Sequence, residues 1–342
     1  MTAANQSSGD LTADRRAEFA RHYAKAGDFE AAADLIGQAL DLAPDHLPFL
    51  ALKGDWLTKA GRAADAAEVW RAMLRLDAAD RFGAQLKLAS LGLTETPDAP
   101  PAAYVESLFD DFAPTFDRSL VQRLDYHAPQ QVAAAVFAAL GPDAQAIRHA
   151  VDLGCGTGLM GEHLRSRTSF LEGLDLSAGM LRRAAAKKIY DRLEKGDVAV
   201  PAPDSEPGRA DLAVAADVYI YLGDLAPAMR TAARLLQPGG LYAFTVEAHD
   251  GPEDYALRSS LRYAHGAAYL RRALAETGFD VLTLKRVFLR MDGTARIEGH
   301  LVVARKADAA IALTTLSPAL DAPVADMPNR IDLDLRDEDI EP

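Results

Sequence analysis

The chain has 342 residues, of which 49% are hydrophobic and 25% are charged, and its formal net charge is −13 at pH 7. This composition excludes a fibrous or wholly disordered protein and predicts a globular one with room for two ordinary domains. The acidic balance argues against a nucleic-acid partner, because a sequence-independent nucleic-acid surface needs clustered lysines and arginines to neutralise phosphates.

The N-terminal residues show no apolar core of signal-peptide length, and no later run reaches the roughly 20 apolar residues that span a bilayer. We therefore expect a cytoplasmic protein without a membrane span, in which residues 1–12 are a disordered N-terminus. The single cysteine, Cys155, excludes an intramolecular disulfide and any metal cluster with several cysteines.

Residues 13–92 contain an internal repeat. The stretch KAGDFEAAADLIGQALDLAP returns as KAGRAADAAEVWRAMLRLDA, and the aligned glycines, Gly27 and Gly61, are 34 residues apart (61 minus 27). This period resembles the tetratricopeptide repeat (TPR), a pair of antiparallel helices. The resemblance implies a groove for a protein partner or for self-association, and a structural extension of the next domain is an equally good interpretation.

Residues 93–103, LTETPDAPPAA, are rich in proline and predict a semi-rigid linker. In the segment from Tyr104 to Tyr126, apolar residues recur at helical spacing around Pro114: Phe109, Phe112, Phe116, Leu120 and Leu124. Because such a face needs an apolar partner, we expect this segment to form a lid over a substrate site, with plain helix packing as the alternative. Tyr104 and Tyr219 are further candidates to line that site.

Strand-like runs then alternate with helix-like segments, which predicts a parallel sheet covered by helices on both faces. The runs are HAVDL, FLEGLDL, ADLAVAA and LYAFTVE. Two last candidates, VLTLKRVFLRM and ARIEGHLVVAR, follow each other without a helix and predict an antiparallel hairpin at the sheet edge. Residues 307–342 are acidic and poor in aromatic residues, which predicts a mostly disordered tail.

The stretch VDLGCGTGLMG, residues 151–161, can be a glycine-rich ligand loop in two registers. A loop built on Gly154, Gly156 and Gly158 suits a methyl donor, whereas one shifted to end at Gly161 suits a dinucleotide. The dinucleotide register would place Asp152 inside a buried strand, which is costly for an unpaired carboxylate. The first register ends the strand at residues 151–153, turns Asp152 toward a cationic amino group in the ligand crevice, and leaves Gly161 to pack closely on a strand.

Two further acidic residues follow strand candidates. Asp175 ends the second strand, where a carboxylate can accept hydrogen bonds from both hydroxyls of a ribose in either class of ligand. Asp197 follows the expected third strand, where it could bind an adenine amino group, with a surface turn as the alternative.

Residues 104–306 resemble the class I S-adenosylmethionine (SAM)-dependent methyltransferases. Four stretches give this resemblance, and they follow each other in the order found in the family: VDLGCGTG, LEGLDLSAGML, GDV and ADLAVAADVYIYLGDLAPAMRTAARLLQPGGLYAFTVE. The resemblance implies an α/β Rossmann-like domain with a seven-stranded sheet, mostly parallel with an antiparallel last strand, after an all-α TPR domain. The chain looks most like a bacterial group of TPR-containing methyltransferases related to quinone-type methyltransferases.

By this resemblance the methyl donor is SAM, and its site comprises Asp152, Gly154, Cys155, Gly156, Gly158, Asp175, Leu176, Met180, Asp197, Val198 and Asp217. Met180 would pack on the adenine, and Asp217 would lie next to the methyl group. Acid–base candidates are His265, Tyr263 and Tyr221, followed by His127 and His249, because histidine titrates near neutral pH. We expect no metal, because no pair of histidines or acids shows helical ligand spacing with a third ligand nearby.

Four functional hypotheses follow. The first is in-line transfer of a methyl group to an oxygen, sulfur, nitrogen or activated carbon atom of a small molecule in an apolar pocket. In the second, the repeats recruit a protein that the second domain methylates. The third is a non-catalytic, SAM-binding assembly factor, and the fourth, an NAD-dependent oxidoreductase, is disfavoured by Asp152 and Asp197.

Overall fold

The computed structural model describes four stretches of the chain: 7–117, 125–141, 146–201 and 206–308. Leu120 and Leu124, residues 1–6 and the expected tail from residue 309 lie outside these stretches. The expectation of disorder through residue 12 is corrected, because the first helix already begins at Leu11. Asp10 caps it, accepting hydrogen bonds from the backbone N–H groups of Thr12 and Ala13 at 2.8 and 2.9 Å.

The N-terminal part is all-helical. Its helices are α1 (Leu11–Lys25), α2 (Phe29–Leu40), α3 (Leu47–Lys59), α4 (Ala63–Leu76) and α5 (Ala84–Ser90), and each packs on the next. Gly27 and Gly61 turn the chain between the helices of each pair, with φ of 85° and 79°. The Trp70 ring is fully buried against Gly54, where a Cβ would lie 2.3 Å from the ring. These helices, residues 11–90, are called the helical region below.

The rest of the described chain is built on a nine-stranded sheet. Its strands are β1 (Ile147–Leu153), β2 (Thr168–Asp175), β3 (Arg192–Lys195), β4 (Ala210–Ala215), β5 (Leu236–His249), β6 (Tyr255–Leu257), β7 (Tyr263–Gly266), β8 (Phe279–Asp292) and β9 (Ala295–Lys306). The order is β3-β2-β1-β4-β5-β7-β6, with the β8–β9 hairpin joined antiparallel to β5 through β9. The mostly parallel sheet and the late hairpin agree with the prediction.

The expected number of seven strands is corrected to nine. The additional strands are β6 and β7. They can form because β5 is 14 residues long and extends beyond the residues that pair with β9. β9 pairs with residues 241–247 of β5, and the last residues, 247–249, pair in parallel with β7 instead. The segment RYAHG, expected to carry acid–base residues, is therefore part of the sheet.

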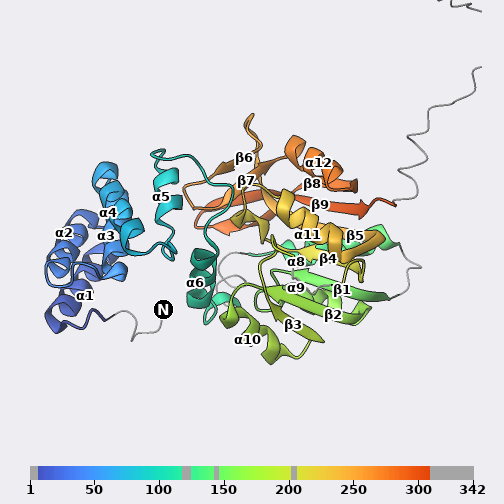
Figure 1. The fold of residues 1–342 in the computed structure, drawn as a ribbon, viewed down its shortest axis with the longest axis horizontal. Helices are drawn as coiled ribbons and strands as arrows, with labels where there is room; N and C mark the ends of the chain where they lie inside the picture. The colour runs from blue at the N-terminus through green and yellow to red at the C-terminus, as the bar shows by residue number, and fades with distance from the viewer. Residues whose placement is uncertain (1–6, 118–124, 142–145, 202–205, 309–342) are drawn as a thin grey trace, which may run out of the picture. The chain divides into compact units, whose positions relative to one another are not determined.

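Helices cover both faces of this sheet (Figure 1). The apolar core on one face includes residues of α8 (Ala128–Leu140) and α9 (Leu159–Leu164), and the core on the other includes residues of α11 (Ala226–Leu235) and α12 (Ala267–Glu276). Two more helices, α6 (Ala102–Phe112) and α10 (Ala178–Lys187), pack on each other. The chain leaves β1 for β2 on one side and reaches β4 on the other, so the carboxyl ends of β1 and β4 form the crevice where such sheets bind ligands.

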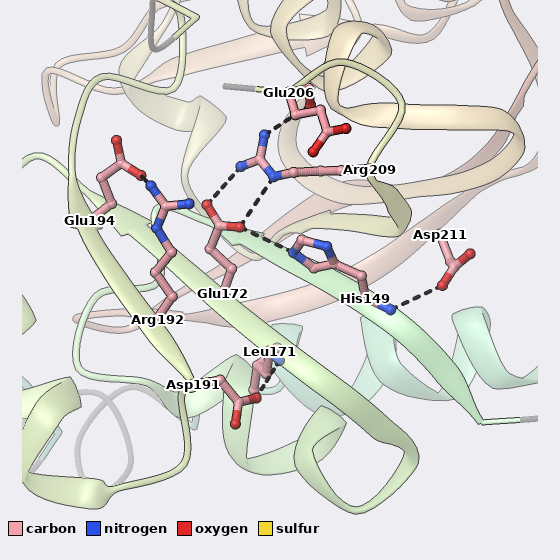
Figure 2. Close-up of polar contacts among 9 residues, drawn as sticks. All are labelled: His149, Leu171, Glu172, Asp191, Arg192, Glu194, Glu206, Arg209 and Asp211. Carbon is pink, nitrogen blue, oxygen red and sulfur yellow. Dashed lines mark hydrogen bonds and ion pairs between the residues drawn. The ribbon is translucent and has the colours of Figure 1, made fainter. Parts of the chain in front are cut away.

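A buried carboxylate ties the central strands together. Figure 2 shows Glu172 of β2 between the side chains of His149 and Arg209. The Arg209 guanidinium donates to Glu172 at 2.7 Å, and Nε2 of His149 lies 3.1 Å from the other carboxylate oxygen. Asp211 of β4 accepts a hydrogen bond from the backbone N–H of His149 at 3.0 Å. These contacts join β1, β2 and the start of β4, and so fix the strands whose ends form the crevice.

Candidate functional site

A cavity of about 190 Å³ opens at the carboxyl ends of the parallel strands. Its walls come from the loops after β1, β2, β3 and β4, from α6 and from the segment before α6. Most of the residues expected to bind a donor line this cavity: Gly154, Gly156, Asp175, Leu176, Met180, Asp197, Val198 and Asp217. The structure therefore brings together side chains that are spread over more than sixty residues of sequence.

The glycine loop begins where the methyl-donor register places it, because β1 ends at Leu153. Gly154 has a φ of +70°, and a Cβ there would lie 2.6 Å from the Val218 side chain, so no larger residue fits. The backbone N–H of Gly156 donates to Asp175 at 2.8 Å. Gly158 caps α9 and lies outside the cavity lining.

Two carboxylates from the ends of β2 and β3 face the cavity. Asp175 accepts hydrogen bonds from the N–H groups of Gly156 and Ser177, both at 2.8 Å, and burial raises its pKa. Asp197 accepts one from the N–H of Ala199 at 2.8 Å. Both carboxylates are thus held by backbone donors, and their orientation does not depend on flexible side chains.

Asp152 and Cys155 line a smaller neighbouring cavity of about 40 Å³, which shares Gly154 and Gly156 with the main one. Asp152 is 1% exposed, and its Oδ2 accepts a hydrogen bond from the Tyr190 hydroxyl at 2.6 Å. Its Oδ1 has no hydrogen-bond partner among the described residues. Burial raises the pKa of Asp152 to about 7, so this carboxyl can gain or lose a proton near neutrality.

Asp217 lies beyond the end of β4 in a left-handed conformation, with a φ of +60°. Nη1 of Arg290 donates to its two carboxylate oxygens at 2.7 and 2.6 Å, and the other arm of Arg290 pairs with Glu247. Arg290 is 1% exposed and lines the cavity together with Arg262. Arg290 was not among the expected site residues, because it lies on β8, 73 residues from Asp217, in a strand without a recognisable motif.

Only some of the residues expected to form a lid line the main cavity, and the lid itself stays a prediction. Phe109 and Phe116 line the main cavity, and the Tyr221 ring lies 5.1 Å from that of Phe109. Phe112 packs on Phe116, but it is 41% exposed and does not line the cavity. Tyr104 packs against Gly83 of the helical region, where burial raises its pKa to about 12.

Two carboxylates of α6 bind it to the part of the chain that forms the nine-stranded sheet, called the sheet domain below. Asp110 accepts hydrogen bonds from the Ser177 hydroxyl at 2.5 Å and from the Gly179 N–H at 2.8 Å, at the start of α10. Glu106 pairs with Lys195 at 2.5 Å. These two carboxylates, one helical turn apart, therefore hold α6, which carries Phe109, beside the cavity.

Three residues lie in the core, which corrects their assignment: Tyr219, expected to line the substrate site, and the acid–base candidates His265 and Tyr263. Tyr219 is fully buried, and its hydroxyl lies 2.5 Å from that of Tyr242. His265 is fully buried in β7, with Nε2 at 2.9 and 3.0 Å from the carbonyl oxygens of Leu222 and Gly223. Because carbonyl oxygens only accept, Nε2 carries the proton, and burial lowers the pKa of His265 to about 4. His265 is thus a neutral structural donor.

Tyr263, the third of these residues, binds the linker. Its hydroxyl donates to the carbonyl oxygen of Pro97 at 2.6 Å. The carbonyl oxygen of Asp98 accepts from the N–H groups of Gly223 and Asp224 at 2.7 and 3.0 Å. The linker residues that follow, Ala99, Pro100 and Ala102, line the main cavity.

The remaining expectations concern His127, His249 and Gly161. His127 and His249 lie outside the cavity lining, paired with Asp125 and Glu253, each at 2.9 Å. Gly161 was expected to pack on a strand, but its close neighbour is the Tyr190 ring: a Cβ on Gly161 would lie 2.4 Å from the hydroxyl oxygen. Within the described stretches, three or more metal-binding side chains nowhere gather in a cluster, and none of the helices there could cross a membrane.

The comparisons with known proteins concern the same part of the chain. Residues 151–242 match a family model described as a methyltransferase domain. The malonyl-[acyl-carrier protein] O-methyltransferase of Pseudescherichia vulneris is 34% identical over 136 residues, which cover 39% of this chain and 52% of that protein. The ubiquinone biosynthesis O-methyltransferase of Methylococcus capsulatus is 27% identical over 146 residues, 41% of this chain and 57% of the relative.

The chain spans about half the length of the curated relatives it matches. Among solved structures, the 1,6-didemethyltoxoflavin-N1-methyltransferase of Burkholderia thailandensis aligns with 63% of this chain and 94% of its own. The identity is 21% and the TM-score is 0.48.

Proposed function

Because the chain carries a SAM-dependent methyltransferase domain, we propose that it transfers the methyl group of SAM to a small-molecule nucleophile. The observation that carries this proposal is the composition of the main cavity. Its lining combines backbone and carboxylate groups suited to an aminoacyl nucleoside with apolar side chains, among them Phe109 and Phe116. A polar donor and an apolar acceptor would thus meet within one enclosed space.

The residues at the glycine loop suit the amino-acid part of SAM. A Cβ on Gly156 would meet only the Phe116 ring, at 3.9 Å, so a ligand can approach the backbone there, and Oδ1 of Asp152 has no hydrogen-bond partner among the described residues. In the proposal, Asp152 binds the ammonium group of SAM, Asp175 binds the ribose hydroxyls, and Asp197 binds the adenine amino group. Leu176, Met180 and Val198 pack on the adenine.

SAM supplies a methyl group that is already activated by the positively charged sulfur. The protein's remaining tasks are alignment and exclusion of water, and alignment alone can lower the barrier by roughly 7–11 kcal/mol. In the proposal the apolar lid excludes water. Asp217 lies beside the reacting atoms and is neutralised by Arg290, so it contributes a fixed dipole rather than a free base.

Tyr221 is the residue of the expected acid–base set that lines the cavity, and its side chain hydrogen-bonds with Arg262. Burial raises the pKa of Tyr221, so its hydroxyl stays protonated near neutral pH and can donate to an acceptor molecule. We therefore assign Tyr221 to orientation of the acceptor and not to proton abstraction.

Calorimetry with S-adenosylhomocysteine, the product of the donor, tests the proposal. We expect binding by the wild-type chain and a loss of roughly ten- to a hundred-fold in affinity for Asp175→Asn, which weakens hydrogen bonds to a charged acceptor. Asp34→Asn on the helical region, 69% exposed, is the matched control and should bind normally. Absence of wild-type binding at high ligand concentration would sink the proposal.

The helical region supports a second proposal, that it is a TPR array which binds a protein partner or a second copy of the chain. Its paired helices and like turns at Gly27 and Gly61 are what such an array requires. The partner could be the methyl acceptor, or an assembly that uses the domain without catalysis. Incubation of labelled SAM with cell lysate separates these: label in a protein band favours a protein acceptor, and label in extractable small molecules favours the first proposal. The cytoplasmic location stays a prediction.

A further inference from the structure

The Tyr190 side chain lies in a nest made by three glycines from separate parts of the chain. A Cβ on Gly161 would lie 2.4 Å from the Tyr190 hydroxyl oxygen, and Cβ atoms on Gly158 and Gly173 would lie 3.1 and 3.0 Å from its ring. Gly158 caps α9, Gly161 is within α9, and Gly173 is in β2. One cap position, one helical position and one strand position thus lack a side chain where this ring lies, so the chain makes specific room for Tyr190.

In this nest the Tyr190 hydroxyl lies within hydrogen-bond distance of Asp152. The O–H donates to Oδ2 at 2.6 Å, and the other oxygen, Oδ1, is buried without a partner among the described residues. Asp152 lines the small cavity of about 40 Å³ beside the glycine loop, which has room for a group the size of an ammonium ion. One oxygen of Asp152 is therefore occupied by the protein, and the other is left for a ligand.

We propose that Tyr190 is a positioning residue of the donor site, which holds Asp152 so that its free oxygen binds the ammonium group of the donor's amino-acid part. This inference rests on the proposed function, since it needs an aminoacyl ligand in the glycine loop. A hydroxyl is a suitable partner for this task, because it fixes the carboxylate by hydrogen bonding and adds no positive charge that would repel the ammonium group.

The inference predicts that donor binding is coupled to the loss of a proton. The groups that face Asp152 are the Tyr190 hydroxyl, which lowers its pKa, and Asp175, which raises it. Burial is the main cause that raises the pKa of the Cys155 thiol and of the Tyr126 hydroxyl, and the Asp152 charge adds to it. Both groups therefore stay protonated and neutral, and neither brings a positive charge to Asp152. Burial raises the pKa of Asp152 to about 7, whereas an ammonium ligand binds the ionised form. Affinity should therefore fall by about ten-fold for each pH unit below the pKa.

The test is calorimetric titration of S-adenosylhomocysteine into the wild-type chain and Tyr190→Phe, over the range from about pH 5.5 to about pH 8.5. The phenylalanine keeps the ring in its nest and removes the hydroxyl. We expect affinity to fall by about ten-fold or more, and the midpoint of the pH profile to move to higher pH, because the hydrogen bond that lowers the pKa of Asp152 is gone. Tyr242→Phe is the control: its hydroxyl is also hydrogen-bonded to a side chain, that of Tyr219, but lies in the core outside both cavities.

Asp152→Asn and the double variant show whether Tyr190 acts through Asp152. If it does, Tyr190→Phe adds little to the loss already caused by Asp152→Asn. An equal loss in both backgrounds, or an unshifted pH profile in Tyr190→Phe, would overturn the inference.

A titration of the ligand-free chain, followed by NMR of carbon-13-labelled aspartate carboxyl groups, tests the same contact without a donor. The Asp152 signal should titrate at higher pH in Tyr190→Phe than in the wild-type chain, and identical titration would count against the inference. If the wild-type chain binds no S-adenosylhomocysteine while this shift is present, the proposed function fails and the control of Asp152 by Tyr190 stands.

Discussion

Arg290, which lines the main cavity, neutralises two buried carboxylates. It is buried between Asp217 and Glu247, and all three side chains are at most 10% exposed. Replacing it with an uncharged residue would leave two carboxylates buried without a counter-charge, and each would then have to ionise at a cost or take up a proton.

We predict that Arg290→Met lowers the free energy of unfolding by about 3–5 kcal/mol at neutral pH. The loss should shrink as the pH falls, because protonation of the two carboxylates removes the uncompensated charge. Denaturant unfolding at two pH values measures both effects. Arg286→Met, on the same strand and 45% exposed, is the control and should cost less than about 1 kcal/mol. Equal losses for the two variants would contradict this account.

At the scale of single residues, local signals were enough for part of the site. Gly154, Gly156 and Asp175 lie within or directly after strands with clear apolar runs, so their positions follow from the chain order alone. Arg290 and Tyr190 contact partners 73 and 38 residues away, and neither carries a local motif. Their roles depend on tertiary packing that no short stretch of sequence encodes.

Helix α9 contains a glycine that contradicts helix propensity. In an ordinary helix, replacing glycine with alanine stabilises the fold by up to about 1 kcal/mol. At Gly161 the added methyl group would lie 2.4 Å from the Tyr190 hydroxyl oxygen. It would displace a ring that also packs against Gly158 and Gly173.

We predict that Gly161→Ala destabilises the protein by about 1–3 kcal/mol in spite of the better helix propensity, because overpacking outweighs it. The control is Gly37→Ala in α2, where a Cβ would meet only the end of the Lys53 side chain, at 3.6 Å. That variant should be neutral or stabilised by up to about 1 kcal/mol. Thermal unfolding of both variants measures the difference, and stabilisation by Gly161→Ala would show that the Tyr190 ring is free to move.

At the scale of elements, the strands with long apolar runs were predictable, whereas the short β6 and β7 were not. The apolar runs of β1, β2 and β4 stand out because these strands are buried on both faces of the sheet. β6 and β7 have three and four residues, too few to show a period, and they exist only because β5 offers them an edge. The placement of His265 and Tyr263 was wrong for the same reason.

On the scale of the whole molecule, the helical region and the sheet domain belong to one compact unit, residues 1–307. The linker residues Pro97 and Asp98 are hydrogen-bonded to the sheet domain, and Tyr104 packs on Gly83. A short helical array has too few repeats to bury its apolar surface by itself, so its stability depends on these contacts.

We predict that calorimetry shows one unfolding transition, and that Trp70→Ala lowers its midpoint as a whole. Trp70 is fully buried between α3 and α4, and its truncation should cost about 3–5 kcal/mol. Phe19→Ala, at a position 62% exposed on α1, is the aromatic control and should change little. Two separate transitions, of which only one responds to Trp70→Ala, would show that the helical region folds independently.

The fastened linker also decides where the polypeptide can be cut. A truncated chain that starts at Tyr104, the expected first residue of the methyltransferase domain, would lack Ala99, Pro100 and Ala102 and so one wall of the cavity. Asp98, whose carbonyl oxygen is hydrogen-bonded to Gly223 and Asp224, directly precedes Ala99 of that wall. Mechanical tension applied to the helical region by a partner would therefore first load the hydrogen bonds of Pro97 and Asp98, and the cavity wall would move only after these bonds break.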